Sequence, residues 1–164
     1  MKKIVFKYVA YAMLTGMVAF GFSLFLGALE VLGYTAIFVA LSFVFFGVKY
    51  YRDTENAGKI SFTKAFIIGI SIALFTALGI AIVDGLYVTV IHPDFYQEYG
   101  EAALVAAQET GDAVKITDAE TQLKEFNAMS LMQLGFFSGG FMFALVSVIG
   151  LIITIISGLI LQRK

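Results

Sequence analysis

The sequence predicts an all-α integral membrane protein: a four-helix bundle with an extracytoplasmic amphipathic helical hairpin between the third and fourth spans. Three observations lead to this fold class. Hydrophobic residues make up 60% of the 164 residues, only 14% are charged, and the mean hydropathy is +0.90. Soluble domains carry about 25% charged residues, so a soluble fold of this length could not bury so much apolar surface. Four long apolar runs alternate with polar stretches, and basic and acidic residues occupy different stretches.

Composition also limits the chemistry. The chain has no cysteine, which excludes disulfides, thiolate metal sites and cysteine nucleophiles. The net charge of −1 provides no general attraction for nucleic acid. We therefore expect one membrane domain over residues 1–164, with no cofactor, no bound metal and no nucleic-acid partner.

The first span is predicted over about residues 8–29, which carry no charge and follow three lysines. A secretory signal peptide begins in the same way, and its cleavage is the alternative. The apolar run is longer than a usual signal core, and no clear small-x-small cleavage site ends it. The sequence therefore favours a retained transmembrane helix.

The second span is predicted over about residues 34–50. Its uncharged part, residues 33–48, is short for a crossing. Lys49 can extend its ammonium group to the interface, and Tyr50 can lie at the level of the lipid head groups. A re-entrant or shallow hairpin is the alternative.

The third span is predicted over residues 65–91, with Asp84 as its one charge. At about 1.5 Å per residue this run can cross a hydrocarbon core of about 30 Å. Small residues recur every four positions along it and form a stripe on one helix face, where another backbone can come close. This helix-packing stripe consists of Gly69, Ala73, Ala77, Ala81 and Gly85. It suits packing within one chain or, alternatively, a homodimer contact.

A polar insert is predicted over about residues 94–130, as two amphipathic helices joined at Gly111. Asp94 with Gln97, and Thr117 with Glu120, have the spacing of capping boxes at helix starts. The second helix is expected to continue into the uncharged region that follows. Within that region, residues 139–161 are predicted to form the fourth span.

The distribution of charge predicts the orientation in the membrane. Residues 1–7, 49–64 and 162–164 hold nine of the eleven lysines and arginines, whereas residues 92–126 hold eight of the twelve acidic residues. Four spans put the three basic segments on one side, and the positive-inside rule makes that side cytoplasmic. Both termini are then cytoplasmic, the protein is multi-pass in the inner (plasma) membrane, and the acidic insert is extracytoplasmic.

Three short stretches resemble one known family: residues 49–53 (KYYRD), residues 58–62 (GKISF) with Gly69, and residues 92–95 (HPDF). In their order and spacing they are similar to the domain-of-unknown-function 4199 family, small four-span bacterial membrane proteins found mainly in Bacteroidota. The resemblance covers nearly the whole chain. It implies a fold and a membrane location, but no activity.

Asp84 is the main candidate for a functional site, because a carboxyl group inside a span is costly and normally faces a bundle interior or a cavity. Counting residues inward from the predicted outer ends of the spans places three hydroxyl groups near the depth of Asp84 in the membrane, those of Ser23, Ser42 and Ser147. The functional interpretation is an ion or proton site open to the outside. The structural interpretation is a hydrogen-bonded node near the interface, reached by water.

A second group of polar residues falls at the predicted outer face: Glu30 ends the first span, and His92 and Asp94 follow the third. His92 with its neighbours offers too few ligands for a metal site. The structural interpretation is a solvated helix end with an interfacial histidine before a proline turn.

No catalytic constellation is present: the sequence lacks a serine-histidine-carboxylate set, a phosphate loop and an HExxH motif. We therefore expect a non-enzymatic structural or interaction protein, in contact with the lipid bilayer and with a membrane or periplasmic protein or a second copy of itself. The alternative is a small ion- or proton-coupled transporter, or a transporter accessory subunit, centred on Asp84.

Overall fold

The computed structural model describes residues 2–27 and 29–163, and the secondary structure of these residues is helical, without a β-strand. The predicted all-α class is therefore confirmed. Four of the helices are long and apolar enough to cross a membrane: Lys3–Phe25, Val31–Glu55, Phe62–Ile91 and Leu131–Leu161. These agree in number and order with the four predicted spans.

Each candidate span is built around one long α-helix. The helices are α1 (Lys2–Phe25), α2 (Tyr34–Tyr50), α3 (Phe62–Leu86) and α6 (Leu131–Leu161). Short π-helical turns extend two of them: η1 (Leu29–Gly33) and η2 (Tyr51–Glu55) flank α2, and η3 (Tyr87–Ile91) continues α3. Because of these turns the second candidate span, Val31–Glu55, is a longer helical segment than the predicted residues 34–50.

The helix that contains the predicted fourth span is longer than that span. The helix α6 runs from Leu131 to Leu161, and it does not continue from the preceding helix. Met129 has an extended backbone, and the Ser130 backbone N–H donates to the Gln133 side chain at 2.8 Å. The expectation of one helix running from the insert into the fourth span is therefore wrong.

The chain divides into two compact units. The first comprises Met1–Val83 and Gly140–Lys164, and thus α1, α2, most of α3 and most of α6. The second is Asp84–Gly139, with the end of α3, η3, the helices α4 (Phe95–Thr110) and α5 (Ala113–Ala128), and the start of α6.

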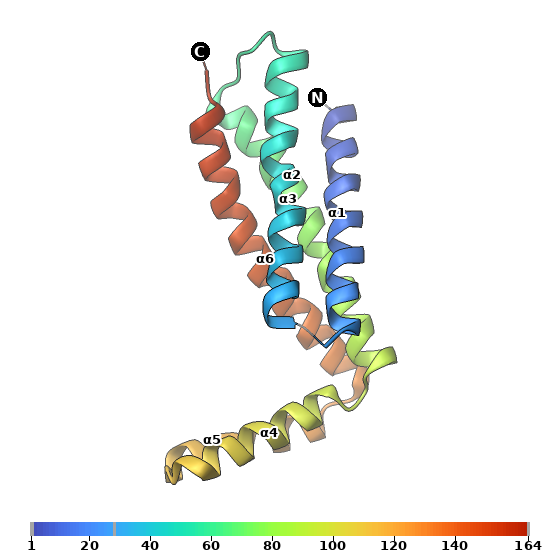
Figure 1. Cartoon of the computed structure of the whole chain (residues 1–164), viewed down its shortest axis with the longest axis vertical. Coiled ribbons are helices and arrows are strands. Elements are labelled where there is room, and N and C mark those ends of the chain that lie inside the picture. The colour runs from blue at the N-terminus through green and yellow to red at the C-terminus, as the bar shows by residue number, and fades with distance from the viewer. Residues whose placement is uncertain (1, 28, 164) are drawn as a thin grey trace. The chain divides into compact units, whose positions relative to one another are not determined.

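Small residues let the helices of the first unit pack closely (Figure 1). A Cβ atom added to Gly69 would lie 2.8 Å from the Thr154 methyl group, and one added to Gly150 would lie 2.7 Å from the Ala73 Cβ atom. Ala73 and Ala77 are fully buried. These members of the predicted stripe therefore contact other helices of the same chain.

One end of the first unit gathers the basic segments of the chain. The backbone of Ile60, in the loop before α3, pairs with that of Arg163 through N–O distances of 3.0 and 2.9 Å. The Lys7 ammonium group lies 5.6 Å from the ring centre of Tyr50, at the end of α2. The start of α1, the loop between α2 and α3, and the end of α6 therefore meet at one end (Figure 1).

The second unit is built on α4 and α5, which separate at Gly111. Gly111 ends α4 with a positive φ of 67°, as predicted for a helix stop. Asp112 then starts α5, because its side chain accepts hydrogen bonds from the backbone N–H groups of Val114 at 3.0 Å and Lys115 at 3.4 Å. Gly100 lies against Leu123, which brings the two helices together.

Neither predicted capping box forms. Asp94 does occupy the position before α4, but its side chain makes no capping hydrogen bond, and Gln97 bonds instead to Glu101 at 3.0 Å. Thr117 lies inside α5, where its hydroxyl donates to the Ala113 carbonyl at 2.9 Å. Asp112, five residues earlier, takes the capping role that the spacing assigned to Thr117.

Candidate functional site

Asp84 lies in the last turn of α3 and is only 8% exposed. The Ser138 hydroxyl, on α6, donates a hydrogen bond to the Oδ2 atom of Asp84. Ser138 is also buried. The two residues are far apart in sequence but belong to the same compact unit, so this hydrogen bond joins α3 to α6.

Tyr96, in the first turn of α4, adds a third oxygen to this site. Its phenol lies close enough to Ser138 and to the Asp84 carboxylate for both to shift its pKa. Burial raises the pKa of the Tyr96 phenol above its ordinary value, Ser138 opposes this shift, and the nearby Asp84 carboxylate adds to it. Both the burial and the carboxylate thus keep Tyr96 protonated and able to donate.

The backbones of α3 and α6 touch beside this site. A Cβ atom added to Gly85 would lie 2.9 Å from the Gly135 carbonyl oxygen, and one added to Gly135 would overlap the Thr89 methyl group. Thr89 in turn donates to the Gly85 carbonyl at 2.8 Å. The glycine pair lets the helices approach until Asp84 and Ser138 are within hydrogen-bonding distance.

Aromatic rings cover Tyr96. Its ring centre lies 4.8 Å from that of Phe126 on α5 and 5.8 Å from that of Phe137 on α6. Phe126 also belongs to a buried cluster with Val88 and Leu134. Contacts from three elements therefore fix the position of Tyr96 next to Ser138.

The three serines predicted to surround Asp84 belong to the first unit. The Ser23 hydroxyl donates to the Phe20 carbonyl and the Ser42 hydroxyl to the Val39 carbonyl, each at 2.6 Å. Among the described residues, the buried Ser147 hydroxyl has no hydrogen-bond partner. A shared layer of these serines with Asp84 stays a prediction.

Sequence reasoning missed Ser138 and Tyr96. Ser138 stood just outside the predicted fourth span, and Tyr96 was taken only as part of the polar insert. The available signal was the GxxxG pair of Gly135 and Gly139, which brackets Ser138 and marks a face where another helix comes close.

Of the predicted outer polar residues, His92 contacts an aromatic ring and an acidic side chain. The His92 ring stacks on Tyr87, with ring centres 5.9 Å apart, and its Nε2 atom lies 3.7 Å from the Glu98 carboxylate. The His92 Nδ1 atom is buried and has no hydrogen-bond partner within the described part of the chain. The side chain of Glu30 lies outside the described residues. Across residues 2–27 and 29–163, no three His, Cys, Asp or Glu side chains are grouped as metal ligands would be.

Comparison with known proteins identifies the family of this chain. The family model described as "Protein of unknown function (DUF4199)" matches residues 6–163. The chain belongs to the DUF4199 family. The resemblance found in the sequence is thereby confirmed, and the match includes Asp84, Tyr96 and Ser138. No curated protein and no solved structure matches the chain.

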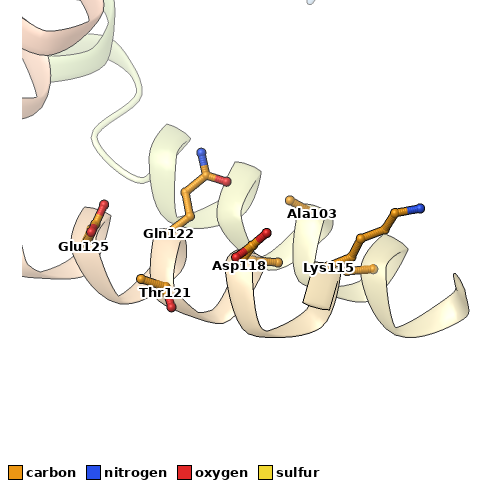
Figure 2. Close-up of a pocket in the computed structure, with 8 residues that line it drawn as sticks. Ala103, Lys115, Asp118, Thr121, Gln122 and Glu125 are labelled. Carbon is orange, nitrogen blue, oxygen red and sulfur yellow. The ribbon is translucent and has the colours of Figure 1, made fainter. Parts of the chain in front are cut away.

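A second feature of this DUF4199 chain is an open groove between α4 and α5, with a volume of about 550 Å³. Alanines from both helices and polar side chains of α5 line it, and Figure 2 draws these side chains as sticks. The lining residues are Ala103, Ala107, Lys115, Asp118, Ala119, Thr121, Gln122 and Glu125. The small alanine side chains in this lining leave room for another chain segment to come close to both helices.

Proposed function

We propose that this DUF4199 protein is a multi-pass protein of the inner membrane that acts through protein contacts and not through catalysis. Four candidate spans with many exposed apolar side chains support the membrane location: Phe6 is 77% exposed, Val18 71% and Phe22 61% on α1 alone. Such side chains suit contact with lipid tails.

The proposed orientation has both termini in the cytoplasm and α4 and α5 outside it, as an extracytoplasmic amphipathic hairpin. It is supported by the basic segments that meet at one end of the first unit, since positively charged segments are retained in the cytoplasm. The acidic character of residues 92–126 agrees with the opposite side.

The groove between α4 and α5 is the observation that carries the proposed role. It is open, alanines from both helices line it, and it lies on the only long polar segment of the sequence. A helix pair of this kind offers a surface on which a membrane or periplasmic protein, or a second copy of the chain, can dock.

Site-specific photo-crosslinking in living cells tests this role. A photoreactive residue at Gln122, which lines the groove, should give discrete crosslinked products. The matched control is Glu120, which is exposed on the same helix but does not line the groove. A product of twice the chain mass would identify self-association. Equal products from both positions, or none from Gln122, would contradict an interaction through the groove.

The second candidate function is a small proton- or ion-coupled membrane protein centred on Asp84. The observation in its favour is the hydrogen bond that the Asp84 carboxyl accepts from Ser138, with Tyr96 next to it. Buried carboxyl groups in membrane spans are a frequent feature of proton and ion pathways.

An Asp84→Asn variant in liposomes separates the two candidates. A coupled protein should lose proton or sodium flux while keeping its melting temperature, because asparagine can still accept a hydrogen bond from Ser138. Flux equal to that of the unchanged protein, together with equal stability, would count against transport and leave the interaction role.

A further inference from the structure

We propose that the groove between α4 and α5 is a self-association site, in which two copies of the chain pair their α5 helices antiparallel about a twofold axis. This pairing deepens the interaction role proposed above and rests on it, because it names a second copy of the chain as the partner. The order of polar side chains along α5 is the observation that leads to it.

The polar side chains that line the groove from α5 are arranged symmetrically about Glu120. Asp118 and Gln122 each lie two residues from Glu120, on opposite sides of it in the sequence. Lys115 and Glu125 each lie five residues from it, and all four line the groove (Figure 2). In a helix with about 3.6 residues per turn, these four positions fall on the side opposite Glu120. The face therefore has the same spacing of polar side chains in either direction.

A twofold axis at the level of Glu120 pairs these side chains with complementary partners. The Lys115 ammonium group of one copy faces the Glu125 carboxylate of the other. The Asp118 carboxylate of one copy faces the Gln122 amide of the other, and it can accept a hydrogen bond from the amide N–H₂ group. Each contact forms twice, because a twofold axis makes the two copies equivalent.

A parallel arrangement of the two helices is unfavourable. It would place each side chain against its own copy, so that Lys115 would face Lys115 and Glu125 would face Glu125. Like charges brought together in this way repel. The order of charges on α5 therefore favours an antiparallel pair.

The polar side chains of this face are available to a partner. Lys115, Asp118, Gln122 and Glu125 are all exposed. The Lys115 ammonium group lies 4.0 Å from the Asp112 carboxylate of the same chain, and an exposed ion pair of this kind contributes little to stability. Among the described residues, Gln122 and Glu125 have no side-chain hydrogen bond or ion pair. Lys115 can therefore turn towards a carboxylate of a second copy.

Alanines on both helices let a partner helix come close to the groove. Ala103 and Ala107 line it from α4, and Ala119 lines it from α5. Helices pack with about 8–10 Å between their axes, and the distance depends on the side chains at the contact. The α5 helix of a second copy can therefore contact both helices that form the groove.

A protein of different sequence is the competing occupant of the groove. The lining contains two acidic side chains and one lysine, so it offers only a weak general attraction for a basic partner. Such a partner would not require opposite charges at Lys115 and Glu125. The effect of reversing these two charges therefore separates the two occupants.

Crosslinking of two differently tagged full-length chains, co-expressed and kept in isolated membranes, tests the pairing. The chain has no cysteine, so single cysteines can be introduced without removing native ones. Asp118→Cys in one chain and Gln122→Cys in the other should be joined by a short thiol-reactive crosslinker, because the two positions face each other. Glu120→Cys in both chains is the control and should give little product, since this position lies on the opposite side of α5.

Charge reversal then tests the register of the pair. Lys115→Glu in both chains, or Glu125→Lys in both, brings like charges together twice and should reduce the crosslinked product about tenfold. A Lys115→Glu chain mixed with a Glu125→Lys chain has opposite charges at both contacts and should regain the product. Both residues are exposed, so an equal melting temperature of each variant confirms that folding is unchanged.

The other outcomes would overturn the pairing. These outcomes are no product from the Asp118→Cys and Gln122→Cys chains, an equal product from Glu120→Cys, and a mixture of reversed chains that gives no more product than either variant alone. If the pairing fails while a photoreactive residue at Gln122 still crosslinks to a protein of another mass, the groove keeps its interaction role with a different partner. If both experiments give no product, the interaction role fails as well.

Discussion

Gly135 shows how strongly single positions determine the contact between α3 and α6. A side chain there would meet the Thr89 methyl group and, at 3.1 Å, the Gly85 carbonyl oxygen. The latter is a backbone atom of a packed helix and cannot turn away. The approach of the two helices, and with it the hydrogen bond between Ser138 and Asp84, therefore depends on the absence of a Cβ atom at Gly135.

We predict that Gly135→Ala lowers the free energy of unfolding by about 1–3 kcal/mol, because the added methyl group overpacks this contact. The matched control is Gly140→Ala on the same helix, where an added Cβ atom has no neighbour within 4 Å. This control should be neutral or more stable by up to about 1 kcal/mol, since alanine is the better helix former. Thermal unfolding in detergent measures both, and equal effects would contradict the packing argument.

At the residue scale the sequence identifies Asp84 but not its partners. A lone carboxyl group in an apolar run is visible in any hydropathy pattern, and the glycines near it show which helix face packs. The partner of Asp84 depends on how α3 and α6 are rotated and shifted along each other. Counting residues from the predicted span ends cannot give this rotation and shift. An error of a few residues in a span end would bring a different serine to the depth of Asp84.

The helix ends are the main difference between expectation and structure at the scale of elements. Long apolar runs predict that a helix exists, but not where it stops, since polar residues can continue it at an interface. The second span continues to Glu55 through η2, and α6 begins at Leu131 while its first turns still lie in the second unit. Local capping decides these ends, and a two-residue spacing pattern occurs too often by chance to locate a cap.

The start of α5 gives a direct test of capping. We predict that Asp112→Ala destabilises the first turn of α5 by about 1 kcal/mol, because two backbone N–H groups lose their acceptor. Hydrogen exchange of these amides in the full chain should then be about fivefold faster. Thr117→Val is the control and should leave the exchange unchanged, since the Thr117 hydroxyl bonds only within its own helix. Faster exchange in Thr117→Val but not in Asp112→Ala would contradict this account and support the predicted capping box of Thr117 and Glu120.

For the whole molecule, the central claim is that lipid surrounds the spans and that the basic end faces the cytoplasm. Composition predicts the first part and charge distribution the second, because both follow from simple transfer free energies. The division into two compact units could not be predicted, since it depends on contacts of α4 and α5 with the ends of α3 and α6. The absence of native cysteines makes the orientation easy to measure.

The most direct test is labelling of single cysteines in intact cells with a reagent that cannot cross the inner membrane. Asp112→Cys, at the join of α4 and α5, should be labelled in cells whose outer barrier is permeable. Asn56→Cys, in the loop between α2 and α3, should be labelled only after the inner membrane is broken. Labelling of Asn56→Cys in intact cells with protection of Asp112→Cys would contradict the orientation, and labelling of both without membrane disruption would contradict the membrane fold itself.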